Sequence, residues 1–202
     1  MANISKQVLD LQRDVVQKFL PKGWKFQQVM YSDSHGHAMQ RCTDENKNEV
    51  TIFLDIDCIP LSKEAFKFLF DDRWSCNNGT LIGCAQRANH LENNKHIYVG
   101  PFCMAFMNAT YEEVGRPTFI ETYRGDVGEE LTYRWQEKNR PVTFLWPSDV
   151  WKPMWNLMAT VEFGMGTTYE DLFYHSFCAR SFEGQALFTN ECNRILEREV
   201  LA

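Results

Sequence analysis

The segment Val50-Thr-Ile-Phe-Leu-Asp55-Ile-Asp57-Cys-Ile-Pro60-Leu61 is the most informative part of the chain. Five β-favouring or apolar residues lead directly into two aspartates that are one residue apart, and Pro60 follows. A short apolar run bounded by turn residues predicts a buried central strand, most often in a parallel sheet. Open α/β sheets bind ligands in the crevice beyond the carboxyl ends of their strands. We therefore expect Asp55 and Asp57 to lie at a ligand site.

The two aspartates are expected to act together. Side chains alternate along a strand, so both carboxylates should point to the same side. Neighbouring carboxylates repel each other unless a cation lies between them. Their oxygen atoms suit Mg²⁺ or Mn²⁺, which usually bind through one or two carboxylates plus substrate phosphates. The pattern predicts a divalent metal site that holds a phosphorylated ligand.

Phe53-Leu-Asp-Ile-Asp-Cys-Ile-Pro-Leu61 also resembles the DxD segment of GT-A-type glycosyltransferases, which use a nucleotide-sugar donor. In that family the aspartates hold a divalent metal against the donor diphosphate. The resemblance implies a single α/β domain over residues 1–202, a shortened GT-A-like fold whose mixed, mostly parallel sheet is flanked by helices. It further implies a nucleotide- and metal-binding part at residues 1–62. Residues 63–202 would form the acceptor part and a C-terminal lid.

The resemblance assigns roles near the C-terminus. GT-A-like enzymes often complete the metal site with a histidine on a segment that folds over the bound donor, and His175 matches in order and context. A lone histidine among aromatic residues is otherwise more often a satisfied core residue. Arg180 is expected to meet the diphosphate charge, because a planar guanidinium pairs well with phosphate. The glycine pair Gly164 and Gly166 is expected to form a flexible hinge before this segment.

Asp126 is the expected general base. In inverting GT-A-like enzymes, an acidic residue at the start of the helix beyond the sugar site deprotonates the acceptor hydroxyl. Glu129 and Glu130 are the other acidic candidates in this stretch, and Asp126 is favoured to face a cleft. The alternative is structural, because Asp126 and Glu129 also have the spacing of a capping box.

Three further residues are expected to contact the donor. Asp33 and His35 belong to a polar loop after an expected strand at residues 25–31, and the alternative for both is a solvated turn. Arg87 follows an expected strand at residues 80–85, and its alternative is an exposed loop residue.

The remaining pattern predicts alternating helices and strands. Helices are expected at residues 5–20, 35–41, 62–70, 110–115, after Asp126, and at 183–201. Further strands are expected at residues 98–107, with a bend at Gly100-Pro101, and at 142–147 and 157–163. An aromatic loop with Trp151 and Trp155 should join the last two.

The implied function is metal-dependent transfer of a sugar from a nucleotide sugar, with a UDP-sugar as the expected donor, to an acceptor hydroxyl. Compact chains with this segment order resemble uncharacterised bacteriophage glycosyltransferases, for which a hydroxylated DNA base is one acceptor class. One alternative is a haloacid-dehalogenase-type phosphatase, whose first motif also ends a strand with Asp-x-Asp. That motif normally continues with Gly-Thr or Gly-Val, whereas Cys58-Ile59-Pro60 follows here. A non-catalytic nucleotide-binding module is the other alternative.

Composition limits the remaining choices. The chain has 202 residues, of which 44% are hydrophobic and 14% aromatic, enough for a globular domain with its own core. Its net charge of −6 argues against a protein that coats nucleic acid over a broad surface. Seven cysteines without paired CxxC spacing favour thiols in a reducing compartment. No apolar run approaches the roughly 20 residues of a membrane span. We expect a cytoplasmic enzyme, in the host cytoplasm if the chain is viral, with no membrane partner.

Overall fold

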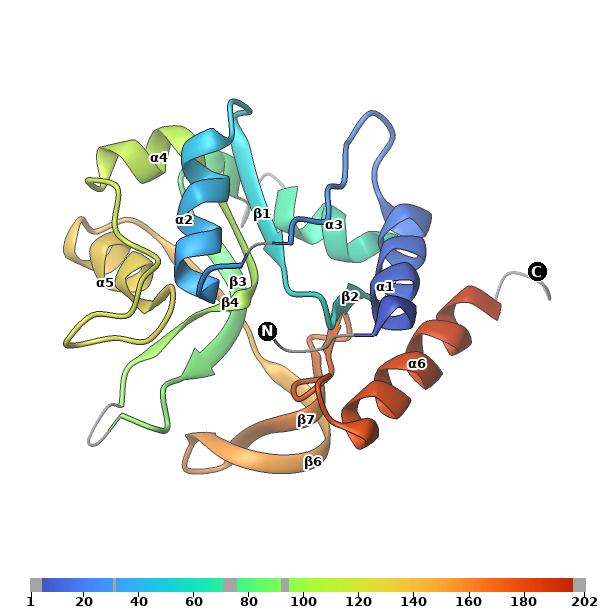
Figure 1. Cartoon of the computed structure of the whole chain (residues 1–202). Helices are drawn as coiled ribbons and strands as arrows, with labels where there is room; N and C mark the ends of the chain where they lie inside the picture. The colour runs from blue at the N-terminus through green and yellow to red at the C-terminus, as the bar shows by residue number, and fades with distance from the viewer. Residues whose placement is uncertain (1–4, 31, 71–75, 92–94, 198–202) are drawn as a thin grey trace. The chain divides into compact units, whose positions relative to one another are not determined.

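The computed structural model describes residues 5–30, 32–70, 76–91 and 95–197 (Figure 1). The fold is mixed α/β, with a mixed sheet and flanking helices. The helices are α1 (Lys6–Phe19), α2 (His35–Glu45), α3 (Lys63–Phe70), the 3₁₀ helix η1 (Cys76–Asn78), α4 (Asn108–Glu113), α5 (Glu129–Glu137) and α6 (Phe182–Glu197). The strands are β1 (Val50–Leu54), β2 (Cys58–Pro60), β3 (Leu81–Arg87), β4 (Ile97–Met107), β5 (Val142–Leu145), β6 (Pro147–Met158), β7 (Val161–Tyr169) and β8 (Phe173–His175).

Two compact units alternate along the chain. The terminal unit comprises the described residues of 1–30, 55–67 and 147–202, and the central unit those of 31–54 and 68–146. Each unit has its own four-stranded sheet and its own hydrophobic cluster. The residues expected to bind metal all belong to the terminal unit.

The sheet of the central unit has the strand order β1-β4-β3-β5. β4 runs antiparallel to both β1 and β3, and among the described strands only β3 and β5 form a parallel pair. The expectation of a mostly parallel sheet is therefore wrong. Parallel neighbours need a crossover of a dozen or more residues, usually a helix, whereas residues 88–96 between β3 and β4 are too few.

The position of β1 also differs from the expectation. It lies at the edge of the sheet as far as the chain is described, and most of its residues are only partly buried. The expectation of a buried central strand is wrong. An apolar run indicates that side chains avoid water, but it does not indicate which strands lie on either side. The ring of Phe53 instead packs on Phe119, with ring centroids 5.6 Å apart.

The bend expected in β4 is confirmed. Gly83 of β3 pairs with Met104, whereas Ala85, two residues further on, pairs with Val99. Residues 100–103 therefore bulge out of the regular pairing with β3, as expected where a glycine and a proline interrupt a strand.

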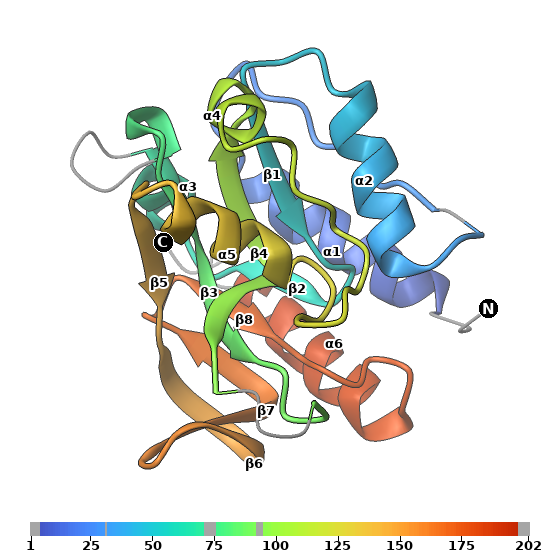
Figure 2. The same ribbon diagram turned by 90° about the vertical axis from the view of Figure 1, so that its left-hand side faces the viewer.

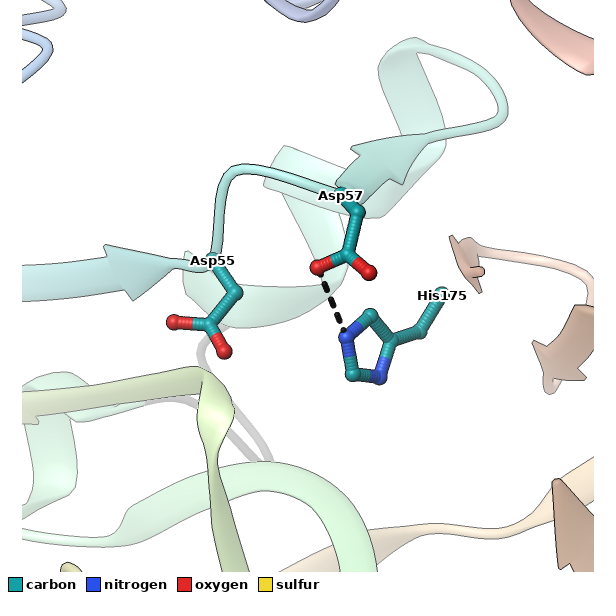
Figure 3. Close-up of side chains that lie close together, drawn as sticks. All are labelled: Asp55, Asp57 and His175. Atoms are coloured by element: carbon teal, nitrogen blue, oxygen red, sulfur yellow. Dashed lines mark hydrogen bonds and ion pairs between the residues drawn. The ribbon is translucent and has the colours of Figure 1, made fainter. Parts of the chain in front are cut away.

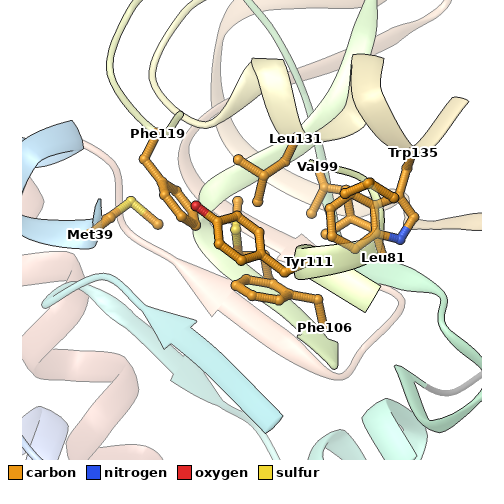
Figure 4. Close-up of a cluster of buried hydrophobic side chains, with 10 residues drawn as sticks. Met39, Leu81, Val99, Phe106, Tyr111, Phe119, Leu131 and Trp135 are labelled. Atoms are coloured by element: carbon orange, nitrogen blue, oxygen red, sulfur yellow. The ribbon is translucent and has the colours of Figure 1, made fainter. Parts of the chain in front are cut away.

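Helices α2, α4 and α5 share one hydrophobic cluster with the central sheet (Figure 4), and α5 lies in front of that sheet in Figure 2. The cluster includes Met39 from α2, Tyr111 from α4 and Trp135 from α5. The Phe106 ring of β4 lies 5.6 Å from that of Tyr111 and 6.1 Å from that of Trp135. The Trp135 indole N–H donates to the Gly79 carbonyl over 3.0 Å, which satisfies its polar atom inside the core.

The sheet of the terminal unit has the order β2-β8-β7-β6 and is antiparallel throughout. Helices α1 and α6 lie side by side (Figure 1). Lys18 near the end of α1 donates a hydrogen bond to the Ile195 carbonyl of α6 over 2.7 Å. Val8 of α1, Ile59 of β2 and Phe188 of α6 belong to one cluster. This cluster joins both helices to the strand that follows the two aspartates.

The helices expected at residues 5–20, 35–41 and 62–70 are confirmed as α1, α2 and α3. The terminal helix is confirmed as α6 up to residue 197, and residues 198–201 lie outside the described chain. The helix expected at residues 110–115 begins earlier, at Asn108. No strand forms over residues 25–30, so that expectation is wrong, and Tyr31 lies outside the described residues. Strand formation needs a neighbour to pair with.

β6 and β7 form a long hairpin where the sequence predicts a loop and a separate strand. Trp151 and Trp155 lie within β6, and the strand expected at residues 157–163 contains the hairpin turn at residues 159–160. Pairing with β7 makes this aromatic segment a strand of the hairpin and not a loop.

Gly164 and Gly166 lie within β7, so the expected hinge is a strand. A Cβ atom on Gly164 would lie 2.7 Å from the Met154 nitrogen of β6 and closer still to the Lys152 carbonyl. Gly166 has a φ of +71°. Gly164 is therefore needed because β6 lies so close to it, and Gly166 because its φ lies in the left-handed region. Neither requirement depends on a flexible segment.

All seven cysteines lie in the described part of the chain, and each is a thiol rather than half of a disulfide. Within the described residues, no helix has both the length and the apolar character needed to cross a membrane.

Candidate metal site

Asp55 and Asp57 lie in the turn that connects β1 to β2. The turn is closed by a hydrogen bond from the Cys58 N–H to the Asp55 carbonyl over 2.9 Å. The two side chains approach the same site, but from a turn and not from alternate positions of one strand. Because the chain turns between Asp55 and Asp57, both carboxylates can face the same point although the two residues do not belong to one strand.

His175 is brought to this turn by sheet pairing. It is the last residue of β8, and it lies opposite Cys58 of β2 on one side and Thr167 of β7 on the other. One potential ligand atom from each of Asp55, Asp57 and His175 lies within 4.8 Å of the other two (Figure 3). The structure thus brings together all three residues expected to bind metal.

The Asp57 carboxylate is held on both oxygens. Its Oδ1 lies 3.1 Å from Nε2 of His175, and its Oδ2 accepts a hydrogen bond from the Ala179 N–H over 3.3 Å. Its backbone carbonyl accepts from the Ser176 N–H over 3.0 Å. Asp57 and His175 are only 8% and 4% exposed. A carboxylate at this depth needs such partners, because burying an uncompensated charge is strongly unfavourable.

An aromatic cluster packs beside the imidazole through Phe177. The centroid of the Phe177 ring lies 3.8 Å from that of His175, and the rings of Trp155 and Phe163 each lie 5.6 Å from Phe177. Phe177 and Cys178 have φ values of +44° and +58°, in the left-handed region that non-glycine residues rarely adopt. This conformation turns the chain so that Ala179 reaches Asp57.

The donor set fits a divalent cation. Around an octahedral ion with bonds of about 2.1 Å, ligand atoms at right angles lie about 3.0 Å apart. The Nε2 of His175 and Oδ1 of Asp57 already lie 3.1 Å apart. The two carboxylates suit both ions expected from the sequence, Mg²⁺ and Mn²⁺, whose usual ligands are oxygen atoms.

The other expected site residues each have a defined place within their own unit. Asp33 forms an ion pair with Arg41 of α2, and His35 is the exposed first residue of that helix. Arg87 is the partly buried last residue of β3. These residues belong to the central unit, whereas Arg180 is exposed in the terminal unit, five positions after His175.

Asp126 of the central unit is a partly exposed carboxylate in a defined position. Its Oδ2 accepts a hydrogen bond from the Tyr98 hydroxyl over 3.2 Å, and its Oδ1 accepts from the Val127 N–H over 2.7 Å. Its own N–H donates to the Glu129 carboxylate over 2.9 Å, but the N-cap of α5 is Gly128, so the expected capping box does not form. Burial, and then the charges of Asp126 and Glu129, raise the pKa of Tyr98 well above its ordinary value. Tyr98 therefore stays protonated and donates to Asp126.

Sequence reasoning missed Gln12. It lies on α1 among the apolar residues Val8, Val15 and Val16, and its side chain is buried. Its amide bonds to backbone carbonyls of the turn that carries Asp55 and Asp57. A polar residue on the buried face of an amphipathic helix was the available signal.

Comparisons with protein-family models, with curated proteins and with solved structures gave no match, so the geometry of the site is the basis for assigning a function.

Proposed function

We propose that the protein is a metal-dependent glycosyltransferase that moves a sugar from a nucleotide-sugar donor to an acceptor hydroxyl. Asp55, Asp57 and His175 would hold Mn²⁺ or Mg²⁺ against the donor diphosphate. The observation that carries the proposal is the convergence of His175 on the Asp-x-Asp turn across 118 positions of sequence. An Asp-x-Asp pair alone is common, whereas a buried imidazole at hydrogen-bond distance from it is a specific arrangement.

A bound divalent ion would offset the charge that develops on the departing nucleoside diphosphate. The chain's own residues have separate tasks. Asp57 is oriented by the Ala179 N–H, and His175 is oriented by its aromatic neighbours, so both ligands are in place beforehand. Arg180 is exposed and can pair with phosphate oxygens through its planar guanidinium.

Asp126 is proposed to accept the proton of the acceptor hydroxyl in an inverting reaction. A carboxylate that is partly accessible and fixed by Tyr98 can act as such a base. Asp33 and His35 remain proposed contacts of the nucleotide, Arg87 remains a proposed contact of the donor near its sugar, and a UDP-sugar is the proposed donor. A hydroxylated DNA base is the proposed acceptor class, which places the reaction in the cytoplasm, that of the host if the chain is viral.

The phosphatase alternative uses Asp55 as a covalent nucleophile. Its Asp-x-Asp motif does not by itself account for the buried His175 beside Asp57. The sequence Cys58-Ile59-Pro60 also replaces the Gly-Thr or Gly-Val that normally continues that motif. The glycosyltransferase proposal accounts for both features.

A panel of nucleotide sugars in the presence of Mn²⁺ tests the proposal, scored by thermal shift and by release of nucleotide. One preferred nucleotide sugar should stabilise the protein and release nucleotide slowly, because water is a poor substitute for the acceptor. The same preparation should neither hydrolyse phenyl phosphate nor bind beryllium fluoride at Asp55. Robust phosphomonoesterase activity would favour the phosphatase instead.

A further inference from the structure

Gln12 is a polar residue on the buried, apolar face of helix α1. Helix α1 buries Val8, Val15 and Val16, and Gln12 lies on the same buried face with an exposed fraction of 1%. A side-chain amide in such a position is unfavourable unless all its hydrogen bonds are made. The buried Gln12 amide therefore needs hydrogen-bonding partners, which an apolar residue at this position would not need.

Those partners belong to the turn that carries the metal ligands. The Nε2 of Gln12 donates to the carbonyl of Asp55 and to the carbonyl of Cys58, the latter over 3.2 Å. These carbonyls stand at the two ends of the turn, which the Cys58 N–H already closes onto Asp55. One NH₂ group thus bridges both ends, and it fixes the backbone from which Asp55 and Asp57 project.

A second glutamine holds Gln12 in this orientation. The Nε2 of Gln28 donates to Oε1 of Gln12 over 3.1 Å and to the carbonyl of Leu9 over 2.8 Å. The acceptor end of Gln12 is thereby occupied, so its NH₂ end must face the turn. This also settles which way round the amide lies, since only a donor can bond to two carbonyls.

We propose that Gln12 is a positioning residue for the metal site, which sets the separation and direction of the Asp55 and Asp57 carboxylates. This inference rests on the proposed function only in requiring that the site bind a divalent cation. Removing a group that orients metal ligands without binding the metal typically lowers the metal affinity about 10- to 100-fold. His175 and Ala179 hold the Asp57 carboxylate itself, whereas Gln12 acts on the backbone of the turn from which both carboxylates project.

Gln12→Met tests the proposal, because methionine has a similar length and no hydrogen-bonding amide. Mn²⁺ alone is the probe, and its free concentration is followed by electron paramagnetic resonance at a temperature where every variant is folded. We expect the Kd for Mn²⁺ to rise about 10- to 100-fold, with an altered line shape for the bound ion. Gln28→Met removes the bond that orients the Gln12 amide, and it should raise the Kd by a smaller factor.

Thr43→Val is the matched control. Thr43 is also buried, and its hydroxyl donates to the Met39 carbonyl over 3.0 Å, but it lies in the central unit. It should lower the melting temperature and leave Mn²⁺ affinity unchanged. A Kd for Gln12→Met equal to that of the wild type overturns the inference and leaves the metal site intact. If Gln12→Met does not fold, an unchanged Kd for Gln28→Met overturns it in the same way. Failure of the wild type to bind Mn²⁺ would remove the metal site, and the proposed function with it.

Discussion

The imidazole of His175 lies against the carboxylate of Asp57, with Nε2 3.1 Å from Oδ1, although the two residues are 118 positions apart. The contact depends on the pairing of β2 with β8, in which Cys58 lies opposite His175. A slip of one residue would turn His175 to the other face of the sheet. Register therefore decides whether the third ligand reaches the site.

Replacing His175 should affect both metal binding and stability. His175→Ala removes one ligand, and we expect the Mn²⁺ affinity to fall by at least about 10-fold. It also leaves the buried Asp57 without one of its partners, which should lower the free energy of unfolding by about 1–3 kcal/mol. Calorimetric titration and chemical unfolding measure the two effects. The exposed His37 of the central unit is the control: His37→Ala removes a bond to the Ser34 hydroxyl, so it should lower stability less than His175→Ala and leave Mn²⁺ affinity unchanged. Unchanged Mn²⁺ affinity in His175→Ala would mean that His175 is only a core residue.

Gly164→Ala should destabilise the protein. The added Cβ would meet the backbone of β6 at Met154 and Lys152, and overpacking of this kind costs about 1–3 kcal/mol. Gly125→Ala is a milder change, because the nearest atom to its Cβ, the Cβ of Glu129, would lie at 3.1 Å, farther than the backbone atoms of β6 lie from a Cβ at Gly164. Amide exchange should also show residues 161–169 protected without metal. Rapid exchange of residues 161–169, together with an unchanged stability of Gly164→Ala, would instead indicate a flexible hinge at Gly164 and Gly166.

The parts of the fold that depend on local chemistry could be predicted from the sequence. Helix α2 begins where Ser34 can accept a hydrogen bond from the His37 N–H, and the bend in β4 follows Gly100-Pro101. Such features involve residues a few positions apart, which the sequence displays directly.

Features that depend on distant partners could not be predicted in this way. The apolar run of β1 indicates partial burial, but not its antiparallel pairing with β4. The turn with Asp55 and Asp57 was found from its motif, and His175 only through the resemblance to a family. Gln12 was missed because its partners lie 43 and 46 positions away, and no periodicity encodes a bond from a side chain to a remote carbonyl.

Stability should decline in alkaline solution because two buried thiols resist ionisation. Burial raises the pKa of Cys192 from 9.0 to about 12, and that of Cys76 to about 11. The unfolded chain therefore loses these protons at lower pH than the folded chain does. The stabilisation is complete below pH 9.0 and is lost as the pH rises toward about 12.

Cys192→Val isolates one of these contributions. Between pH 8 and pH 10 the variant should lose about 1 kcal/mol less of its unfolding free energy than the wild type. Urea unfolding at each pH measures the difference. Parallel pH profiles for the two proteins would show that Cys192 does not contribute.

Asp126→Asn should lower turnover without altering metal binding. Asparagine keeps an oxygen for the Val127 N–H, and its NH₂ group can donate to the Tyr98 hydroxyl oxygen in place of the bond that Tyr98 donates to Asp126, so the local structure should persist. Loss of a general base should reduce the rate by about 10²- to 10⁴-fold. Glu130→Gln is the control, because Glu130 is engaged by Arg124 over 2.5 Å. A larger loss of turnover in Glu130→Gln than in Asp126→Asn would transfer the role of base to Glu130.

The most direct test of the metal site is a calorimetric titration of the wild type and of Asp57→Asn with Mn²⁺, in the presence and absence of a nucleoside diphosphate. Asparagine keeps the size of the side chain and an acceptor for the Ala179 N–H, so the variant should remain folded. The wild type should bind Mn²⁺, and more tightly with the diphosphate present. Asp57→Asn should lose most of that binding in both conditions. Equal Mn²⁺ affinity in the two proteins, or none in the wild type, would contradict a metal site at Asp55, Asp57 and His175.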